Sequence, residues 1–181
     1  MSQAVRSRIA EAVERHGERE VAERAATLIR TGTEEPWFLV AVGGDAAGSG
    51  DPAQFERPVW AALARSWGAR ALQYVWDESA SAAVIAGLGD PAWRVRMNCA
   101  RICALRELEA SAALVPLLAD ANWRVRDAAA LAVGRTGEAE DLAAVLGLLD
   151  DGHEQVRARA AQAVREAQER LDRPLDRDPR A

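Results

Sequence analysis

The sequence predicts an all-α fold, a right-handed α-solenoid (superhelix) of antiparallel helix pairs. Three observations predict it. Hydrophobic residues make up 49% of the 181 residues but aromatic residues only 5%, and the apolar content is mostly Ala, Leu and Val. Ala and Leu are among the strongest helix formers. Apolar residues also recur at helical spacing, and one segment of about 30 residues repeats along the chain.

A tetrapeptide locates the repeat. Trp-Arg-Val-Arg begins at Trp93 and again at Trp123, an offset of 30 residues. A third copy follows at an offset of 31, where Asp151 corresponds to Asp120. Each copy predicts a short apolar helix, a turn with an Asp, and a longer amphipathic helix. One such hairpin cannot bury its own apolar face, whereas stacked copies can, so the repeat predicts a solenoid.

Residues that recur in register are expected to hold the stack together. Asp90, Asp120 and Asp151 lie just before the longer helices, and we expect them to act as helix N-caps. The recurring Arg residues are predicted to reach these Asp residues, in their own or the adjacent turn, and the recurring Trp residues to pack against the neighbouring repeat. The predicted structural positions are Asp90, Trp93, Arg96, Asp120, Trp123, Arg126, Asp151 and Arg157.

The pattern Asp-x-x-Trp-Arg-Val-Arg-x-x-Ala-Ala-x-Ala-Leu-Gly resembles the short HEAT-like repeat first associated with phycobilin lyases. Residues 120–134 match it nearly throughout, while the third copy departs from it at Glu154 and Arg165. The resemblance covers about residues 79–172 and implies stacked helical hairpins. It implies little about function, because such repeats serve many unrelated roles.

The repeat divides the chain into segments within one domain, residues 1–172. The predicted ranges are 1–33 for an N-terminal helical cap (helices over 3–16 and 18–31), 34–78 for a degenerate repeat, 79–110, 111–140 and 141–172 for clear repeats, and 173–181 for a disordered tail. Residues 34–44 include an apolar run that fits either a helix or a strand. We favour a helix, because a lone strand in a helical stack would lack a pairing partner.

Composition restricts the classes of function. All 23 basic residues are Arg, so the chain has no Lys for a Schiff base or for a P-loop. The net charge is −5, with acidic ends and a faintly basic middle. This balance disfavours nucleic acid as a partner, because phosphate neutralisation supplies most of that affinity. We find no signal-peptide pattern and no apolar run near the roughly 18 residues of a membrane span, and we expect a soluble, cytoplasmic protein without membrane contact.

Residues able to carry chemistry are few. Cys99 and Cys103 lie one helical turn apart, a spacing that could chelate a metal. The repeat register, however, places them where the other copies have Ala and Val, so we interpret them as core residues. His16 and His153 lie far apart in sequence, in or near turns, with no ligand or triad pattern around them. The sequence therefore predicts no catalytic residue, no metal and no cofactor.

Positions that differ between copies are the better candidates for binding, because repeat scaffolds bind through variable positions. The leading hypothesis is a non-catalytic scaffold or adaptor whose longer helices line a shallow surface for another protein. Replacing Arg101 and Asp127 with Ala should then weaken a complex without lowering the melting temperature. The candidate binding residues are Trp60, Met97, Asn98, Arg101, Asp127 and Arg159.

Two other functions stay open at this point. Some HEAT-like proteins are DNA glycosylases that hold DNA in a concave, Arg-rich cleft, and the chain has Trp residues and a mildly basic centre that such a cleft would need. Salt-dependent binding of duplex DNA would favour this reading. A lyase-like chaperone for a chromophore is suggested by the name of the resembling family alone.

Overall fold

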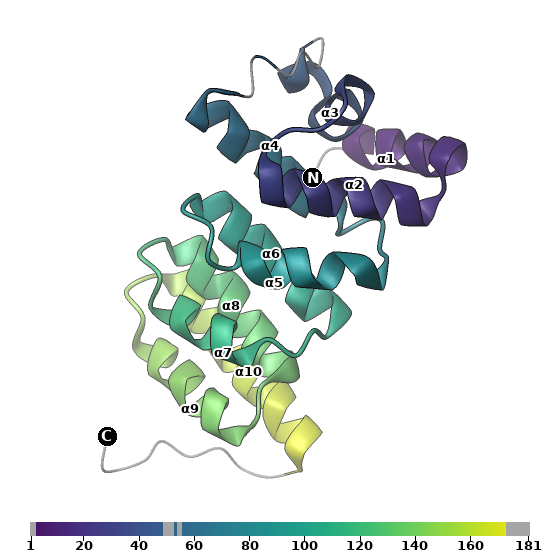
Figure 1. The fold of residues 1–181 in the computed structure, drawn as a ribbon. Helices are drawn as coiled ribbons and strands as arrows, with labels where there is room; N and C mark the ends of the chain where they lie inside the picture. Colours follow the sequence, from purple (N-terminus) through teal and green to yellow (C-terminus); the bar gives the residue numbers. More distant parts are fainter. Residues whose placement is uncertain (1–2, 49–52, 54–55, 173–181) are drawn as a thin grey trace. The chain divides into compact units, whose positions relative to one another are not determined.

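The computed structural model describes residues 3–48, 53 and 56–172, and the regular structure in these residues is entirely helical (Figure 1). The predicted tail at 173–181 lies outside the described residues. The ten α-helices among the described residues are α1 (Gln3–His16), α2 (Glu18–Thr31), α3 (Pro36–Gly43), α4 (Pro58–Ala71), α5 (Ser81–Gly87), α6 (Trp93–Arg106), α7 (Ser111–Leu114), α8 (Trp123–Thr136), α9 (Ala139–Gly147) and α10 (Glu154–Leu171). Short 3₁₀ segments, Val115–Ala119 and Leu148–Asp150, prolong α7 and α9. The predicted all-α class, with helices packed in neighbouring pairs, is confirmed.

The chain divides into two compact units, Met1–Cys99 and Ala100–Ala181. The boundary falls inside α6, so the first half of this helix belongs to the first unit and its second half to the second. Each unit is described by itself below.

The first unit contains α1 to α5 and the beginning of α6. The helices predicted over residues 3–16 and 18–31 are confirmed with the same bounds. Gly32 ends α2 in the left-handed conformation, with a φ of 76°, and its N–H donates to the carbonyl of Leu28. Residues 36–43 form a helix rather than a strand, and Pro36 occupies its first turn, where a missing N–H costs nothing.

The core of the first unit lies between α2, α3 and α4. Phe38 and Leu28 are fully buried there, together with Leu72 just after α4. Helix α2 packs along α4, and Gly68 allows the close approach. A Cβ atom at this glycine would lie 2.7 Å from the carbonyl oxygen of Ala25. Burial of these apolar side chains supplies the main favourable term in folding.

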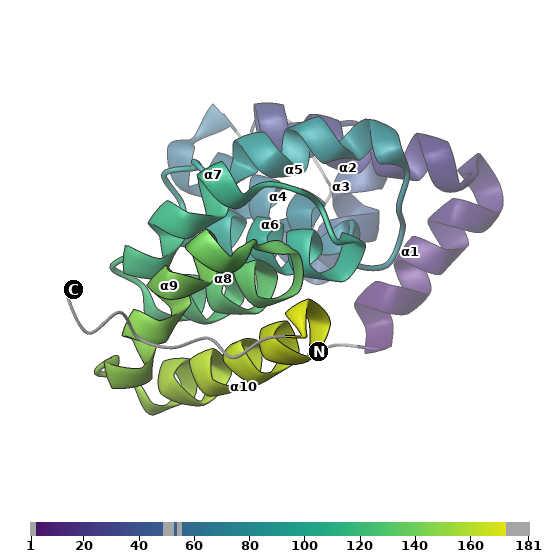
Figure 2. The same cartoon turned by 90° about the horizontal axis from the view of Figure 1, so that it is seen from below.

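The second unit contains the end of α6 and α7 to α10, and Figure 2 shows α8, α9 and α10 side by side. The stripe predicted for the second repeat is buried on α8, where Val125, Ala129 and Val133 have no exposed surface. Small residues bring α8 and α10 together, because a Cβ at Gly134 would lie 2.6 Å from the Cβ of Ala163. The repeat pattern therefore encodes the close contact of these two long helices.

Candidate functional site

The recurring Asp residues close the turns before the longer helices. The Oδ1 atoms of Asp90, Asp120 and Asp151 each accept the backbone N–H two residues ahead, at 2.7, 2.8 and 2.8 Å. The prediction that these residues are the N-caps was wrong by two positions. Asn122 is the N-cap of α8, and its side chain accepts the N–H of Arg124. The Asp residues form Asx-type turns instead, which set the direction of the chain as it enters each helix.

The carboxylates of Asp90 and Asp151 also accept hydrogen bonds from an Arg on the preceding long helix. In the second unit, Arg126 on α8 donates from Nε and Nη2 to the two carboxylate oxygens of Asp151, at 2.7 and 2.9 Å. Its Nη1 donates to the carbonyl of Asp120, at 2.8 Å. This hydrogen-bonded guanidinium holds the pKa of Asp151 below its usual value. Arg126 therefore joins its own turn to the turn of the next helix pair, which is one form of the predicted ladder.

An equivalent link in the first unit was missed by the sequence reasoning. Arg65 on α4 donates to Asp90 from Nε and Nη2, at 2.6 and 3.2 Å. Arg65 lies in the degenerate repeat, where the Trp-Arg-Val-Arg tetrapeptide that locates the recurring Arg is absent. A usable signal was present, because Arg65–Asp90 and Arg126–Asp151 are both separated by 25 residues.

The predicted structural Arg residues also bond to the turn of their own repeat. Arg96 Nη1 donates to the carbonyl of Asp90 at 2.8 Å, and Arg157 Nη1 to the carbonyl of Asp151 at 2.7 Å. In both of these bonds the acceptor is a backbone oxygen of the turn. These arginines are therefore engaged in holding the turns.

The recurring Trp residues are half-buried and stacked. The ring of Trp123 stacks on His153 with a centroid separation of 3.9 Å, and the guanidinium of Arg124 lies 4.2 Å from its centroid. Trp93 has Arg94 over its ring at 4.4 Å. The Arg124–Trp123 and Arg94–Trp93 contacts have the geometry of cation–π pairs. The stacking of His153 on Trp123 was not foreseen, because the turn position of His153 gave no pattern.

A groove in the second unit gathers variable positions. It has a volume of ≈ 410 Å³ and is lined by Arg101 of α6, by Trp123, Arg124 and Asp127 of α8, and by Gln155, Ala158, Arg159 and Gln162 of α10. We call it the α8–α10 groove. Three of the six candidate binding residues, Arg101, Asp127 and Arg159, come together here from three successive long helices.

The polar side chains of the α8–α10 groove are partly bonded to one another. Arg159 donates from Nε to Asp127 Oδ1 at 3.3 Å and from Nη1 to Gln162 Oε1 at 2.8 Å. Gln162 in turn donates to Glu166 at 2.6 Å. Arg101 is half-buried and, among the residues that the structure describes, makes no hydrogen bond or ion pair. Of the three arginines that line the groove, Arg159 is therefore held by hydrogen bonds and Arg124 by stacking on Trp123, while Arg101 has no ion pair within the described residues.

The remaining candidate binding residues do not line this groove. Trp60 and Met97 are half-buried. Asn98 is only 7% exposed; its Nδ2 donates to the carbonyl of Ser66 and its Oδ1 accepts from Gln73, both at 3.2 Å. The expectation that Asn98 belongs to an accessible binding surface is therefore not met. In this copy the variable position satisfies polar groups within the first unit.

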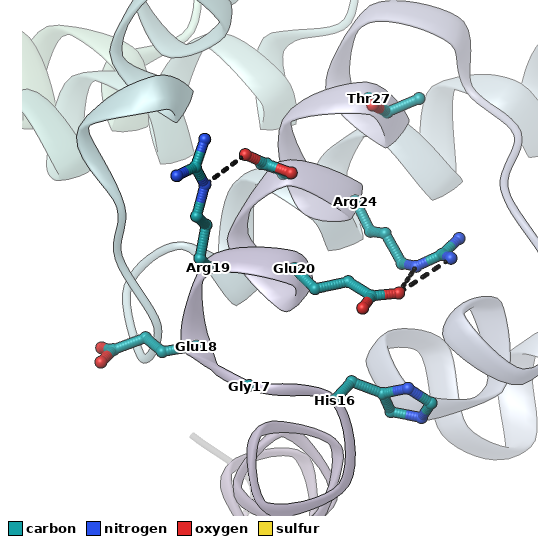
Figure 3. Close-up of a pocket in the computed structure, with 8 residues that line it drawn as sticks. His16, Gly17, Glu18, Arg19, Glu20, Arg24 and Thr27 are labelled. Atoms are coloured by element: carbon teal, nitrogen blue, oxygen red, sulfur yellow. Dashed lines mark hydrogen bonds and ion pairs between the residues drawn. The ribbon is translucent and has the colours of Figure 1, made fainter.

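A second, larger hollow lies beside the start of α2, and Figure 3 shows its lining. Its volume is ≈ 610 Å³. Charged side chains around it pair with one another: Arg19 donates to Glu23 at 2.8 Å, and Arg24 to Glu20 at 3.0 Å. Such exposed pairs one helical turn apart are common on helix surfaces. This hollow therefore offers a ligand fewer unsatisfied groups than the α8–α10 groove.

The two thiols lie in the core. Cys99 and Cys103 are both fully buried, and burial raises the pKa of Cys103 to about 12. Within the described parts of the chain, no group of three or more His, Cys, Asp or Glu side chains is placed to hold a metal ion. In the same parts, no helix combines the length and apolar character needed to cross a membrane.

Comparison with known proteins bears on the repeat region. A family model described as HEAT repeats matches residues 81–165, which include α5 to α9 and most of α10. A search of curated proteins found no match.

Proposed function

Since this chain is a HEAT-like repeat protein across residues 81–165, we propose that it is a scaffold or adaptor that binds another protein through the α8–α10 groove. The division of labour among the repeat positions carries this proposal. Recurring residues such as Arg126 and Asp151 bond to one another and hold the helix pairs. The groove is lined mainly by variable positions from three long helices, among them Arg101, Asp127 and Arg159, with the recurring Trp123 and Arg124 at its side. Repeat scaffolds typically use positions in this way.

Site-specific photocrosslinking tests the proposal directly. A photoreactive amino acid at Ala158, which is exposed and lines the groove, should capture a discrete partner in the native host. The same amino acid at Ala144, equally exposed but on α9 and outside the groove, is the matched control. Arg101→Ala should reduce capture at position 158 several-fold while leaving the melting temperature unchanged, because Arg101 supports no bond within the described fold.

Two results would contradict the proposal. One is an identical set of captured proteins at positions 158 and 144. The other is capture at position 158 that Arg101→Ala leaves intact. A lowered melting temperature in Arg101→Ala would show that this residue contributes to folding, and the photocrosslinks made with Arg101 in place would then decide the question.

DNA binding is the second candidate, and one observation favours it. The α8–α10 groove combines Arg101, Arg124 and Arg159 with Trp123 and Asp127, the residue types that a DNA-holding cleft would use. Two facts weigh against it. Asp127 is already bonded to Arg159, and the chain has a net charge of −5. Nucleic-acid binding needs many phosphate contacts, so a small cationic groove on an acidic protein is a poor basis for it.

A further inference from the structure

We infer that the α8–α10 groove recognises an acidic segment of its protein partner, with the carboxylate of an Asp or Glu side chain bound at Arg101. This inference rests on the proposed protein-binding function and names the chemistry of the partner. It is argued below from the charge of the groove, from the state of Arg101 and from the size of the site.

The groove is locally cationic although the protein is acidic. Arg101, Arg124 and Arg159 line it, and Asp127 is the one carboxylate among its lining residues. Arg159 donates to that carboxylate at 3.3 Å, so Asp127 is already neutralised. The protein as a whole carries a net charge of −5. A positive groove on such a surface selects for a ligand with local negative charge, since complementary potentials steer and orient partners.

Arg101 provides the point of recognition. Its side chain is half-buried and, within the described residues, has no ion pair, whereas Arg126 in the same unit is fully engaged by Asp151. A guanidinium presents five N–H donors in a planar fork that matches a carboxylate, and partial burial strengthens such a bond. A carboxylate from the partner would therefore gain at Arg101 the kind of contact that Arg126 already makes inside the protein.

Neighbouring residues can bind the rest of an acidic segment. Gln155 and Ala158 are exposed along α10 and leave room for a peptide backbone, while Gln155 adds amide donors and an acceptor. Arg124 lies over the ring of Trp123, so its guanidinium is held in place by stacking. Arg101 on α6 and the stacked Arg124 on α8 therefore place two positive charges where a segment with more than one carboxylate could bind.

The size of the site favours a peptide over a nucleic acid. A groove of ≈ 410 Å³ accommodates a few side chains. The guanidinium of Arg101 can bind one carboxylate of a peptide through paired hydrogen bonds. The few cations of this groove neutralise only a small part of a polyanion, whose affinity grows with each phosphate contacted.

Fluorescence anisotropy with labelled peptides tests the inference. The probe is a short fluorescein-labelled peptide with several Glu residues in a Gly/Ser background, and the matched probe carries Gln at the same positions. We expect the Glu peptide to bind at low ionic strength at least about tenfold more tightly than the Gln peptide, because charge-assisted hydrogen bonds are the difference between them. Binding should weaken as salt is added.

Three variants of the protein localise the binding. Arg101→Gln should weaken the Glu peptide about tenfold, since one charge-assisted contact is lost. Arg165→Gln removes the same charge from an exposed position of α10 outside the groove and should change the affinity less than about twofold. Asp127→Asn removes the opposing carboxylate and frees Arg159, so it should tighten binding of the Glu peptide several-fold.

The outcomes separate this inference from the proposed function. Equal affinity for the Glu and Gln peptides, or equal losses in Arg101→Gln and Arg165→Gln, would overturn the acidic-segment inference. So would a single-stranded oligonucleotide of equal charge that binds more tightly than the Glu peptide and depends on Arg101. If the Glu peptide fails while the Ala158 crosslinks still depend on Arg101, the scaffold proposal stands and the partner has another chemistry. If those crosslinks also fail, the proposed function falls with it.

Discussion

Single residues in this protein often have two partners, and Asp151 is the best example. One carboxylate oxygen accepts both the backbone N–H of His153 and Nη2 of Arg126, while the other accepts Nε of the same guanidinium. Without this carboxylate, the half-buried guanidinium of Arg126 would keep only the backbone carbonyls of Asp120 and Ala121 as acceptors. We therefore expect Asp151 to contribute more to stability than the exposed ion pairs of α2 do.

The titration of Asp151 gives a prediction at this scale. Its pKa is lowered in the folded state, so its contribution is fully present above the unfolded pKa near 4 and is lost as the pH falls through the folded value. Asp151→Asn should destabilise the protein by about 2–3 kcal/mol at neutral pH. The difference from the unaltered protein should shrink as the pH is lowered towards 3. Urea denaturation across this pH range measures both quantities, and a constant difference would contradict the prediction.

Residue-level detail is where the sequence was least sufficient. The alignment identified Asp90, Asp120 and Asp151 as special, yet it placed them two positions too close to the helix start. The pattern could not reveal this, because an Asp two residues before the N-cap and an Asp at the N-cap look alike when the intervening residues vary. Asn98 was likewise expected at the surface, since sequence variation between copies does not distinguish an exposed position from a buried polar bond.

Helices and their packing were more predictable than residue contacts. The bounds of α1 and α2 follow from apolar spacing and from Gly17 and Gly32, whose backbones have positive φ. Long helices such as α8 also have a clear apolar stripe. Residues 111–119 were harder, because the predicted apolar helix is a four-residue α-helix followed by a 3₁₀ segment that includes Pro116. Pro lacks the N–H that a regular helix needs, so it favours this change.

Two glycine substitutions test the packing of helices in the second unit. Gly134→Ala would place a Cβ atom 2.6 Å from that of Ala163, so α8 and α10 must separate. We expect a loss of about 1–3 kcal/mol in the free energy of unfolding. Gly147→Ala on α9 meets nothing within 4 Å and has a right-handed backbone, so it should stabilise by about 0.5–1 kcal/mol. Chemical denaturation measures the free energy of unfolding of both variants. A change of the same sign in the two variants would refute the packing argument.

Within each unit, the main packing contacts join helices that are close in sequence, typically each long helix and the next long one. Helix α2 packs along α4 within the first unit, and α8 packs along α10 within the second. The links Arg65–Asp90 and Arg126–Asp151 each lie within one unit. In a chain of this kind stability is close to a sum of local terms, each residue affecting mainly its own neighbourhood.

Hydrogen exchange can test this local organisation. Asp90→Asn should increase amide exchange mainly in α4 and the start of α6, whereas Asp151→Asn should increase it mainly in α8 and α10. The reason is that each carboxylate bonds to a different pair of helices. The two variants serve as controls for each other, because both make the same chemical change. A uniform increase along the chain in both would show that the units do not respond independently.

The link between successive turns also bears on how such a chain could lengthen over evolution. In both units the guanidinium comes from one helix pair and the carboxylate from the next, 25 residues further along. A tandem duplication of one helix pair by unequal recombination would therefore supply a donor for the pair ahead and an acceptor for the pair behind. The added pair could join the stack without new polar contacts having to arise. Substitution at variable positions such as Arg101 could then alter the partner while the inherited link is retained.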